Sequence, residues 1–202
     1  MKKIAAVMFA LTVLGAGWTH AENSGVKVDM TGSALFIIPG ESDAWENGLG
    51  VEGWLRLWFN DNLGVGAVGA IERWGVKSFL GINKTVDNPA IFPLPLGGSA
   101  LLRLPLNRDL NLVFDGGLRI VPVGSDIEVR YLGYSEQVEF DPGAIGVVGG
   151  NLEGTIARSI FLFAGVSYQF DLKKPDIRVQ DQKLGEISLK STTLRAGLGV
   201  RF

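Results

Sequence analysis

Apolar and polar residues alternate with a period of two along eight stretches of the chain between Val26 and Phe202. This period is typical of β-strands with one apolar and one polar face. The stretches span about 26–38, 49–59, 62–72, 99–106, 110–121, 145–157, 160–170 and 192–202. Short joins at 60–61, 107–109 and 158–159 alternate with long ones at 39–48, 73–98, 122–144 and 171–191. The pattern predicts an all-β fold, an eight-stranded antiparallel up-and-down transmembrane β-barrel with short periplasmic turns and longer external loops.

The two faces of the predicted strands differ in charge. The more apolar face carries no charged residue in any stretch, although 20% of the chain is charged. The opposite face carries six basic residues and five acidic ones. They are Lys27, Arg56, Arg103, Arg119, Arg195 and Arg201, with Asp29, Glu52, Glu72, Asp115 and Glu153. Because an unpaired buried charge is costly, this near balance suits a sealed polar lumen, with the apolar face toward lipid.

Polarity is exchanged between the two faces beyond the strand ends. The outward positions become polar: Asp126, Glu128, Arg130, Asp176, Arg178, Gln180, Glu186, Ser188 and Lys190. The inward positions become apolar: Ile127, Val129, Tyr131, Ile177, Val179, Ile187 and Leu189. A strand that leaves lipid for water should show this exchange, whereas a soluble lipocalin-like barrel should not. Val138 and Phe140 break the rule and are predicted to face outward unless a bulge at 141–143 shifts the register.

The inward face supplies the candidate site residues. We expect lumen ion pairs among Glu52, Arg56, Arg103, Asp115, Arg119, Glu153 and Arg195, with the partners left open because sequence does not give the strand shear. Four inward aromatic residues, Trp54, Trp58, Phe161 and Phe163, are expected to pack as a plug or to form a wall for an apolar ligand. An eight-stranded barrel encloses little more than its own side chains. A narrow water-filled path remains an alternative because several inward positions are glycine.

The first 21 residues read as a secretory signal peptide, with Lys2 and Lys3 before an apolar run and small residues before the cleavage site. The predicted mature domain is therefore 22–202. It keeps no histidine, since the single one is His20, and the chain has no cysteine. Histidine-dependent and cysteine-dependent catalysis and the usual zinc sites are thus excluded, and we expect no enzyme activity, metal or cofactor. The weakly acidic balance also argues against nucleic-acid binding.

The last strand alternates to the end of the chain and closes on Phe202. It is similar to the terminal assembly signal of bacterial outer-membrane barrels, and the whole of 22–202 resembles the small OmpA/OmpX/OmpW-type barrels. The resemblance implies an integral protein of the bacterial outer membrane, in contact with its lipid and recognised by the assembly machinery through the C-terminal strand. It brings no motif for an activity.

Two functions follow as expectations. The first is a structural or surface-interaction protein, monomeric, with a largely plugged lumen and with external hairpins that contact an extracellular partner. The second is a narrow channel for small or apolar solutes, which the OmpW resemblance implies. The proline-rich stretch within 73–98 is expected to pack over the barrel mouth.

Overall fold

The computed structural model describes residues 26–41, 43–77, 89–125, 127–131, 134–180 and 182–202. The signal-peptide prediction for 1–21 lies outside these residues. The described part is built of β-strands, and no helix in it is long and apolar enough to cross a membrane.

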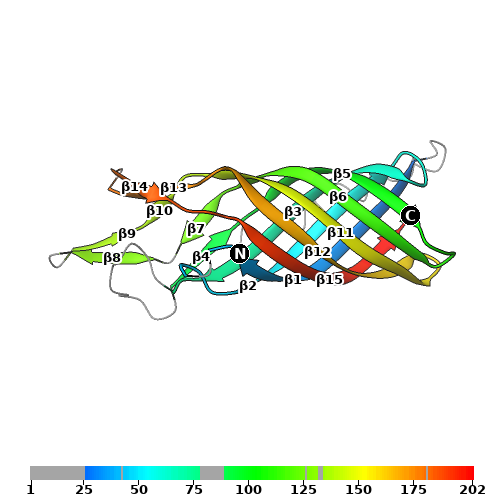
Figure 1. Cartoon of the computed structure of the whole chain (residues 1–202), viewed down its shortest axis with the longest axis horizontal. Helices are drawn as coiled ribbons and strands as arrows, with labels where there is room; N and C mark the ends of the chain where they lie inside the picture. The colour runs from blue at the N-terminus through cyan, green and yellow to red at the C-terminus, as the bar shows by residue number, and fades with distance from the viewer. Residues whose placement is uncertain (1–25, 42, 78–88, 126, 132–133, 181) are drawn as a thin grey trace, which may run out of the picture.

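Eight strands close into one antiparallel barrel, as predicted (Figure 1). They are β1 (Lys27–Pro39), β2 (Gly48–Trp58), β3 (Leu63–Gly75), β5 (Leu96–Pro105), β6 (Leu110–Val121), β11 (Gly143–Ala157), β12 (Ile160–Lys173) and β15 (Ser191–Arg201). Each strand pairs with the next one along the barrel, and the first and last strands pair with each other from Asp29↔Arg201 to Pro39↔Ser191. The barrel therefore has no free edge within the membrane, as a spanning sheet requires.

Further short strands project from one end of the barrel (Figure 1). They are β4 (Ala90–Pro93), β7 (Val123–Ser125), β8 (Glu128–Tyr131), β9 (Tyr134–Gln137), β10 (Glu139–Phe140), β13 (Asp176–Val179) and β14 (Gln182–Glu186). β4 pairs with β3 and β7 and continues the barrel wall. β10, β13 and β14 form a separate three-stranded sheet, and β8 and β9 form a hairpin. These elements arise from the long joins, so this end is the external one.

The predicted exchange of polarity is present at the external end, except at Ser188, which was expected to face outward but is buried because its hydroxyl donates to Asp171. Ile127, Ile177, Ile187 and Leu189 are buried, while Arg178 and Lys190 are at least partly exposed. Asp126 lies outside the described residues, as do the side chains of Glu128, Val129, Arg130 and Tyr131.

The expectation that Val138 and Phe140 face outward is wrong. Val138 is buried and Phe140 packs against the same apolar cluster. The physical reason is the break at Asp141-Pro142, between β10 and β11: Val138 and Phe140 pack inward before it, and the odd-numbered residues Ile145 and Val147 are buried after it. The exception to the polarity rule therefore disappears.

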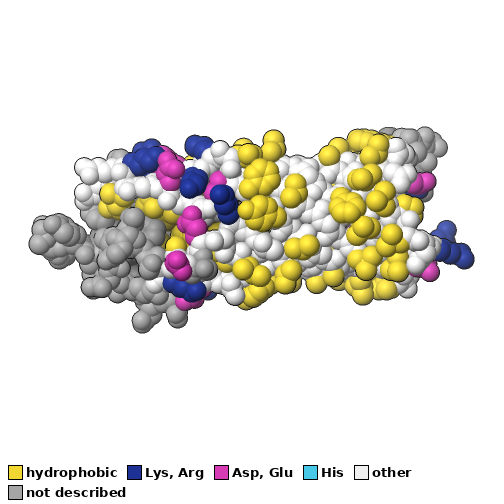
Figure 2. Space-filling view, viewed as in Figure 1, with side chains coloured by type: hydrophobic (Ala, Val, Ile, Leu, Met, Phe, Trp, Pro, Cys, Tyr) yellow, Lys and Arg dark blue, Asp and Glu magenta, His cyan; other side chains and the backbone are white. Residues whose placement is uncertain are grey.

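The outer surface of the barrel carries a belt of exposed apolar side chains (Figure 2). The belt is divided by a waist of small residues, defined here as the outward glycines and alanines near mid-strand. Gly32 pairs with Gly53 and Gly53 pairs with Gly69, while Ala164 and Ala34 both pair with Ala196. In Figure 2 the waist is the pale zone between two bands of apolar side chains.

Candidate functional site in the barrel lumen

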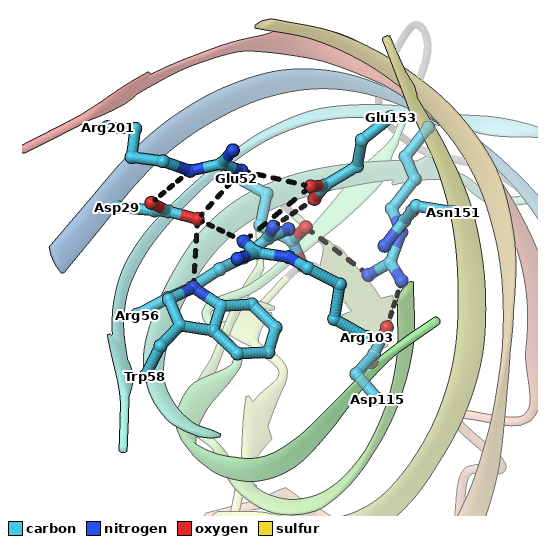
Figure 3. A network of polar contacts seen from close by, with 10 residues as sticks. Asp29, Glu52, Arg56, Trp58, Arg103, Asp115, Asn151, Glu153 and Arg201 are labelled. Atoms are coloured by element: carbon cyan, nitrogen blue, oxygen red, sulfur yellow. Dashed lines mark hydrogen bonds and ion pairs between the residues drawn. The ribbon is translucent and has the colours of Figure 1, made fainter. Parts of the chain in front are cut away.

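All seven predicted ion-pair residues are buried inside the barrel. They come from β2, β5, β6, β11 and β15, and they project into the lumen because alternate residues of a strand point to one face. Each forms at least one ion pair within the lumen, and the pairs join into a network that crosses the barrel axis (Figure 3).

The network is densest around Asp29, near the periplasmic end. Asp29 is fully buried, and its carboxylate accepts hydrogen bonds from Trp58 Nε1 at 2.8 Å and from Arg103 Nη2 at 2.6 Å. Arg201 Nε donates to the other carboxylate oxygen at 3.0 Å. Arg103 also lies 3.7 Å from the centroid of the Trp58 ring, a cation–π distance. One carboxylate thus joins β1, β2, β5 and β15.

Glu153 connects this group to the middle of the lumen. It forms a buried ion pair with Arg56, and Arg201 and Arg103 approach its Oε2 at 3.7 Å and 3.9 Å. Three guanidinium groups therefore surround two carboxylates, Asp29 and Glu153. Charges held this closely attract strongly in a low-dielectric interior, and removing either carboxylate leaves uncompensated positive charge.

Toward the external end, Glu52 takes the central position. Its carboxylate lies 3.1 Å from Arg119 Nη1 and 3.7 Å from Arg195 Nη1. Arg195 also pairs with Asp115 and donates from Nε to Asn151 at 2.6 Å. This group joins β2, β6, β11 and β15 on different sides of the barrel.

The four inward aromatic residues occupy the same zone, and each is at most 4% exposed. Three arginines lie within cation–π range of the Trp54 ring: Arg56, Arg119 and Arg195. Arg201 lies 5.1 Å from the Phe161 ring, and Phe161 and Phe163 contact each other at 6.4 Å between centroids. The aromatic rings therefore fill the space between the charged groups.

Where inward glycines face these aromatic residues, the aromatic rings pack directly against the glycine backbone and leave no open space. A Cβ atom on Gly199 would lie 2.3 Å from the Phe161 ring, and one on Gly66 would lie 2.9 Å from the Trp54 ring. Glycine is needed there because any side chain would collide with the ring. Because aromatic rings occupy the space beside these glycines, the glycines do not support a water-filled path.

A second, apolar cluster closes the external end of the lumen. It combines residues at the outer ends of the barrel strands with residues of the projecting elements. Its members are Leu35, Ile37, Trp45, Ala70, Trp74, Val76, Ile91, Val121, Ile127, Val138, Ile145, Val147, Ile177, Ile187 and Leu189. Trp45, from the β1–β2 connection, meets Trp74 edge-on at 6.3 Å, and Ile91 of the proline-rich stretch is fully buried. The proline-rich stretch was expected to pack over the mouth, but among its described residues only the side chain of Ile91 points into the apolar cluster: β4 continues the barrel wall, and Leu94 and Leu96 beyond it are exposed.

No sequence-family model matches the chain, and no curated protein matches its sequence. The outer membrane protein OprG from Pseudomonas aeruginosa superposes with a TM-score of 0.66 at 11% identity, over 89% of this chain and 97% of that one. Neisserial surface protein A superposes with a TM-score of 0.54 at 14% identity, over 89% and 98%. This chain has the fold of the small bacterial outer-membrane barrels.

A third similar structure is Ail of Yersinia pestis in complex with the heparin analogue sucrose octasulfate. It has a TM-score of 0.51 at 16% identity, over 88% of this chain and 97% of Ail. With the uncharged belt described above, this fold indicates an integral protein of the bacterial outer membrane.

Several residues at the centre of the network were not among the predicted pairs. Asp29 and Arg201 belong to the inward charged face, but their central place follows from β1 and β15 meeting at the barrel closure. Asn151 was not among the predicted pairs because its side chain is uncharged. Glu72 accepts a hydrogen bond from Trp74 Nε1 at 2.9 Å and so lies where the ion-pair network meets the apolar cluster. The sequence predicts that Glu72 faces inward. It does not predict the contact with Trp74, because the predicted strand ends at residue 72 whereas β3 continues to Gly75.

The three-stranded external sheet is held by charge pairs on its outer face. Lys183 Nζ lies 2.8 Å from both Asp176 and Glu186, and Arg178 pairs with Asp141 at 2.8 Å. The hydrogen bond from Lys183 lowers the pKa of Asp176 from its ordinary 3.8, and the bond to Asp176 raises the pKa of Lys183 from 10.5. The Asp176–Lys183 pair therefore stabilises the sheet fully between about pH 4 and pH 10.

We expect acid to loosen the external sheet before the barrel. As pH falls through the lowered pKa of Asp176, the carboxylate is protonated and its pair with Lys183 is lost. The amide protection factors of β13 and β14, measured by hydrogen exchange, should fall modestly below about pH 4, while those of β12 and β15 stay high. An Asp176→Asn variant should show the lower protection already at neutral pH. Equal protection in both proteins at neutral pH would contradict this role.

Proposed function

We propose that this protein is a non-enzymatic integral outer-membrane barrel whose lumen is closed to hydrophilic solutes and whose role is structural or surface-interacting. The observation that carries the proposal is the presence of two seals in series along one narrow lumen. The inner seal is the ion-pair network with its four aromatic rings, and the outer seal is the apolar cluster. A hydrated ion would have to break buried charge pairs and then cross an apolar zone.

The external elements support the surface-interaction part of the proposal. β8–β9 and the three-stranded sheet stand beyond the membrane belt (Figure 1), where strand edges and charged faces are accessible to a partner. The similar barrel Ail has been solved with a heparin analogue, which shows that this fold can carry a ligand site in that protein. The C-terminal residue Phe202 is exposed beside β1, a position suited to recognition by the assembly machinery.

A narrow channel for small or apolar solutes is the second candidate. The observation that favours it is the apolar cluster itself, because an apolar solute that displaced its buried side chains would pass between uncharged residues such as Trp45, Trp74 and Ile91. The two functions separate in a conductance measurement combined with variants at each seal.

In planar bilayers we expect the wild-type protein to give no steady, large conductance. A Trp58→Ala/Phe161→Ala variant removes two rings of the inner seal and should still conduct little, since the apolar cluster stays in place. Adding Trp45→Ala and Trp74→Ala to this variant should raise the conductance several-fold over that of Trp58→Ala/Phe161→Ala. Folding of each variant is checked by heat-modifiable migration in SDS gels.

Steady, unselective conductance by the wild-type protein would reject the closed lumen and favour the channel. Large conductance from the Trp58→Ala/Phe161→Ala variant alone would show that the apolar cluster does not seal the lumen.

A further inference from the structure

One inward carboxyl group, that of Glu72, has no arginine partner. The other four acids of the inward face each form an ion pair with an arginine: Asp29, Glu52, Asp115 and Glu153. Among the described residues no ion pair reaches Glu72, although it is 1% exposed. Its Oε2 accepts a hydrogen bond from Trp74 Nε1 at 2.9 Å, and its Oε1 has no hydrogen-bond partner. The ion pairs of the inner seal therefore do not account for this buried group.

Groups from three other strands face the Glu72 carboxyl. Arg119 of β6 acts on it as a positive charge and Glu52 of β2 as a negative one, while Gln169 of β12 faces it with a neutral amide. Arg119 is already paired with Glu52 at 3.1 Å. Asp171, the next inward acid of β12, is held by hydrogen bonds from the β14–β15 connection. Among the five acids of the inward face, Glu72 is thus the one that can take up a proton without leaving an arginine unpaired.

The hydrogen-bond partner of Glu72, Trp74, belongs to the outer seal. Trp74 is fully buried and meets Trp45 edge-on at 6.3 Å between ring centroids. At this point the β1–β2 connection is fastened to the end of β3 by backbone hydrogen bonds, from Glu46 N to Gly75 O at 2.8 Å and from Lys77 N to Ala44 O at 2.9 Å. The indole of Trp74 therefore ties the outer seal to a titratable group inside the lumen.

The strength of this tie depends on the charge of Glu72. A hydrogen bond to an ionised carboxylate is roughly twice as strong as one between neutral groups. A proton taken up from solvent occupies one carboxyl oxygen, and the attraction between Glu72 and Arg119 is lost with the charge. The indole of Trp74 is then held less firmly, and its edge-on contact with Trp45 weakens.

We propose that Glu72 is a proton-operated latch on the outer seal: its ionised form holds Trp74 in place, and its protonated form releases the contact between Trp74 and Trp45. The inference rests on the closed-lumen function, because the latch controls one of the two seals. Acid at the cell surface loosens the external mouth while the inner seal stays closed. Glu72 acts through Trp74 and is therefore a positioning residue.

The test measures hydrogen exchange at the amides of Glu46 and Lys77 in the mature protein, held in lipid nanodiscs at about pH 5 and about pH 8. The Asp176–Lys183 pair of the external sheet is intact at both values. After correction for the intrinsic pH dependence of exchange, protection should be about tenfold lower at the acid value. Glu72→Gln should show the low protection at both.

Two further variants assign the effect to the indole. Trp74→Phe keeps a ring and removes the N–H group, so it should lower protection at both pH values, and combining it with Glu72→Gln should add nothing. Trp58→Phe is the matched control, because Trp58 Nε1 donates to another buried carboxylate, Asp29, at 2.8 Å in the inner seal. Trp58→Phe should keep the wild-type pH difference.

Three exchange results would overturn the latch. They are equal protection of the wild type at the two pH values, a pH difference that survives in Glu72→Gln, and high protection of Glu72→Gln at both values. The last result would show that the charge on Glu72 is not needed to hold the indole.

Conductance separates the latch from the closed lumen. In the Trp58→Ala/Phe161→Ala variant the outer seal is the main remaining barrier, so this variant should conduct several-fold more at about pH 5 than at about pH 8. Adding Glu72→Gln should remove the difference and keep the higher value. Steady conductance by the wild type at the higher pH would reject the closed lumen. A closed wild type with equal conductance of the Trp58→Ala/Phe161→Ala variant at both pH values would reject the latch alone.

Discussion

Replacing Asp29 with asparagine is expected to lower the free energy of unfolding of the barrel by about 3–5 kcal/mol, the cost of breaking a buried ion pair on one side. Asp29 is fully buried, and its carboxylate accepts hydrogen bonds from the side chains of Trp58, Arg103 and Arg201. Asparagine keeps the shape but removes the negative charge, so two guanidinium groups remain with less compensation. Because Asp29 and Arg201 are also paired across the closure of β1 and β15, the loss should fall on the seam that completes the barrel.

The measurement is urea-induced unfolding in lipid vesicles, followed by tryptophan fluorescence. Asp61→Asn is the matched control, because Asp61 also pairs with a basic residue, Lys27, but both side chains are exposed in the periplasmic turn. That exposed pair should contribute little, since water screens it. If Asp29→Asn unfolds at the same urea concentration as the wild type, the Asp29 group does not stabilise the closure.

The second large effect is expected on the outer surface. Leu194→Arg should destabilise the barrel by about 2–4 kcal/mol, the cost of a basic side chain near the bilayer midplane of such a barrel. Leu194 is 47% exposed on the lipid-facing side of β15, next to the waist. Leu184→Arg provides the matched control, because Leu184 is 47% exposed but lies on the external sheet. The same substitution at nearly the same exposure should then cost little.

Unfolding in vesicles of both arginine variants separates the two environments. Equal destabilisation, or a larger effect at Leu184, would show that the belt does not meet lipid.

The strands, their inward and outward faces and the buried position of the charged residues could be predicted from sequence, because the period of two fixes which residues share a face. The ion-pair partners could not be predicted in this way. Arg56 meets Glu153 across 97 positions of sequence, and only the shear of the closed barrel brings them to one level.

Bulges and strand extensions also escape the alternation pattern. The outward prediction for Val138 is wrong because the break at Asp141-Pro142, between β10 and β11, reverses which residues face inward on its two sides. β4 and β7 are too short to show a period, and they form because β3 continues past the lipid and offers a free edge to pair with. The network around Asp29 depends on the first and last strands meeting, which is a property of closure rather than of any local segment.

The waist of small residues affects how well the backbone amides of the barrel are protected from hydrogen exchange with solvent. At Gly32 and Gly116 no other atom lies within 4 Å of the place where a side chain would begin, so lipid tails there touch the peptide backbone itself. The waist deepens over β3, β5 and β6 into a shallow groove of about 420 Å³ beside Val65, Ala100 and Leu118. Interstrand hydrogen bonds at this level are shielded by hydrocarbon chains instead of by protein. Deuterium uptake at these amides should therefore follow the bilayer, slow in a thick ordered membrane and faster in a loose micelle, while amides beneath large side chains stay the same in both.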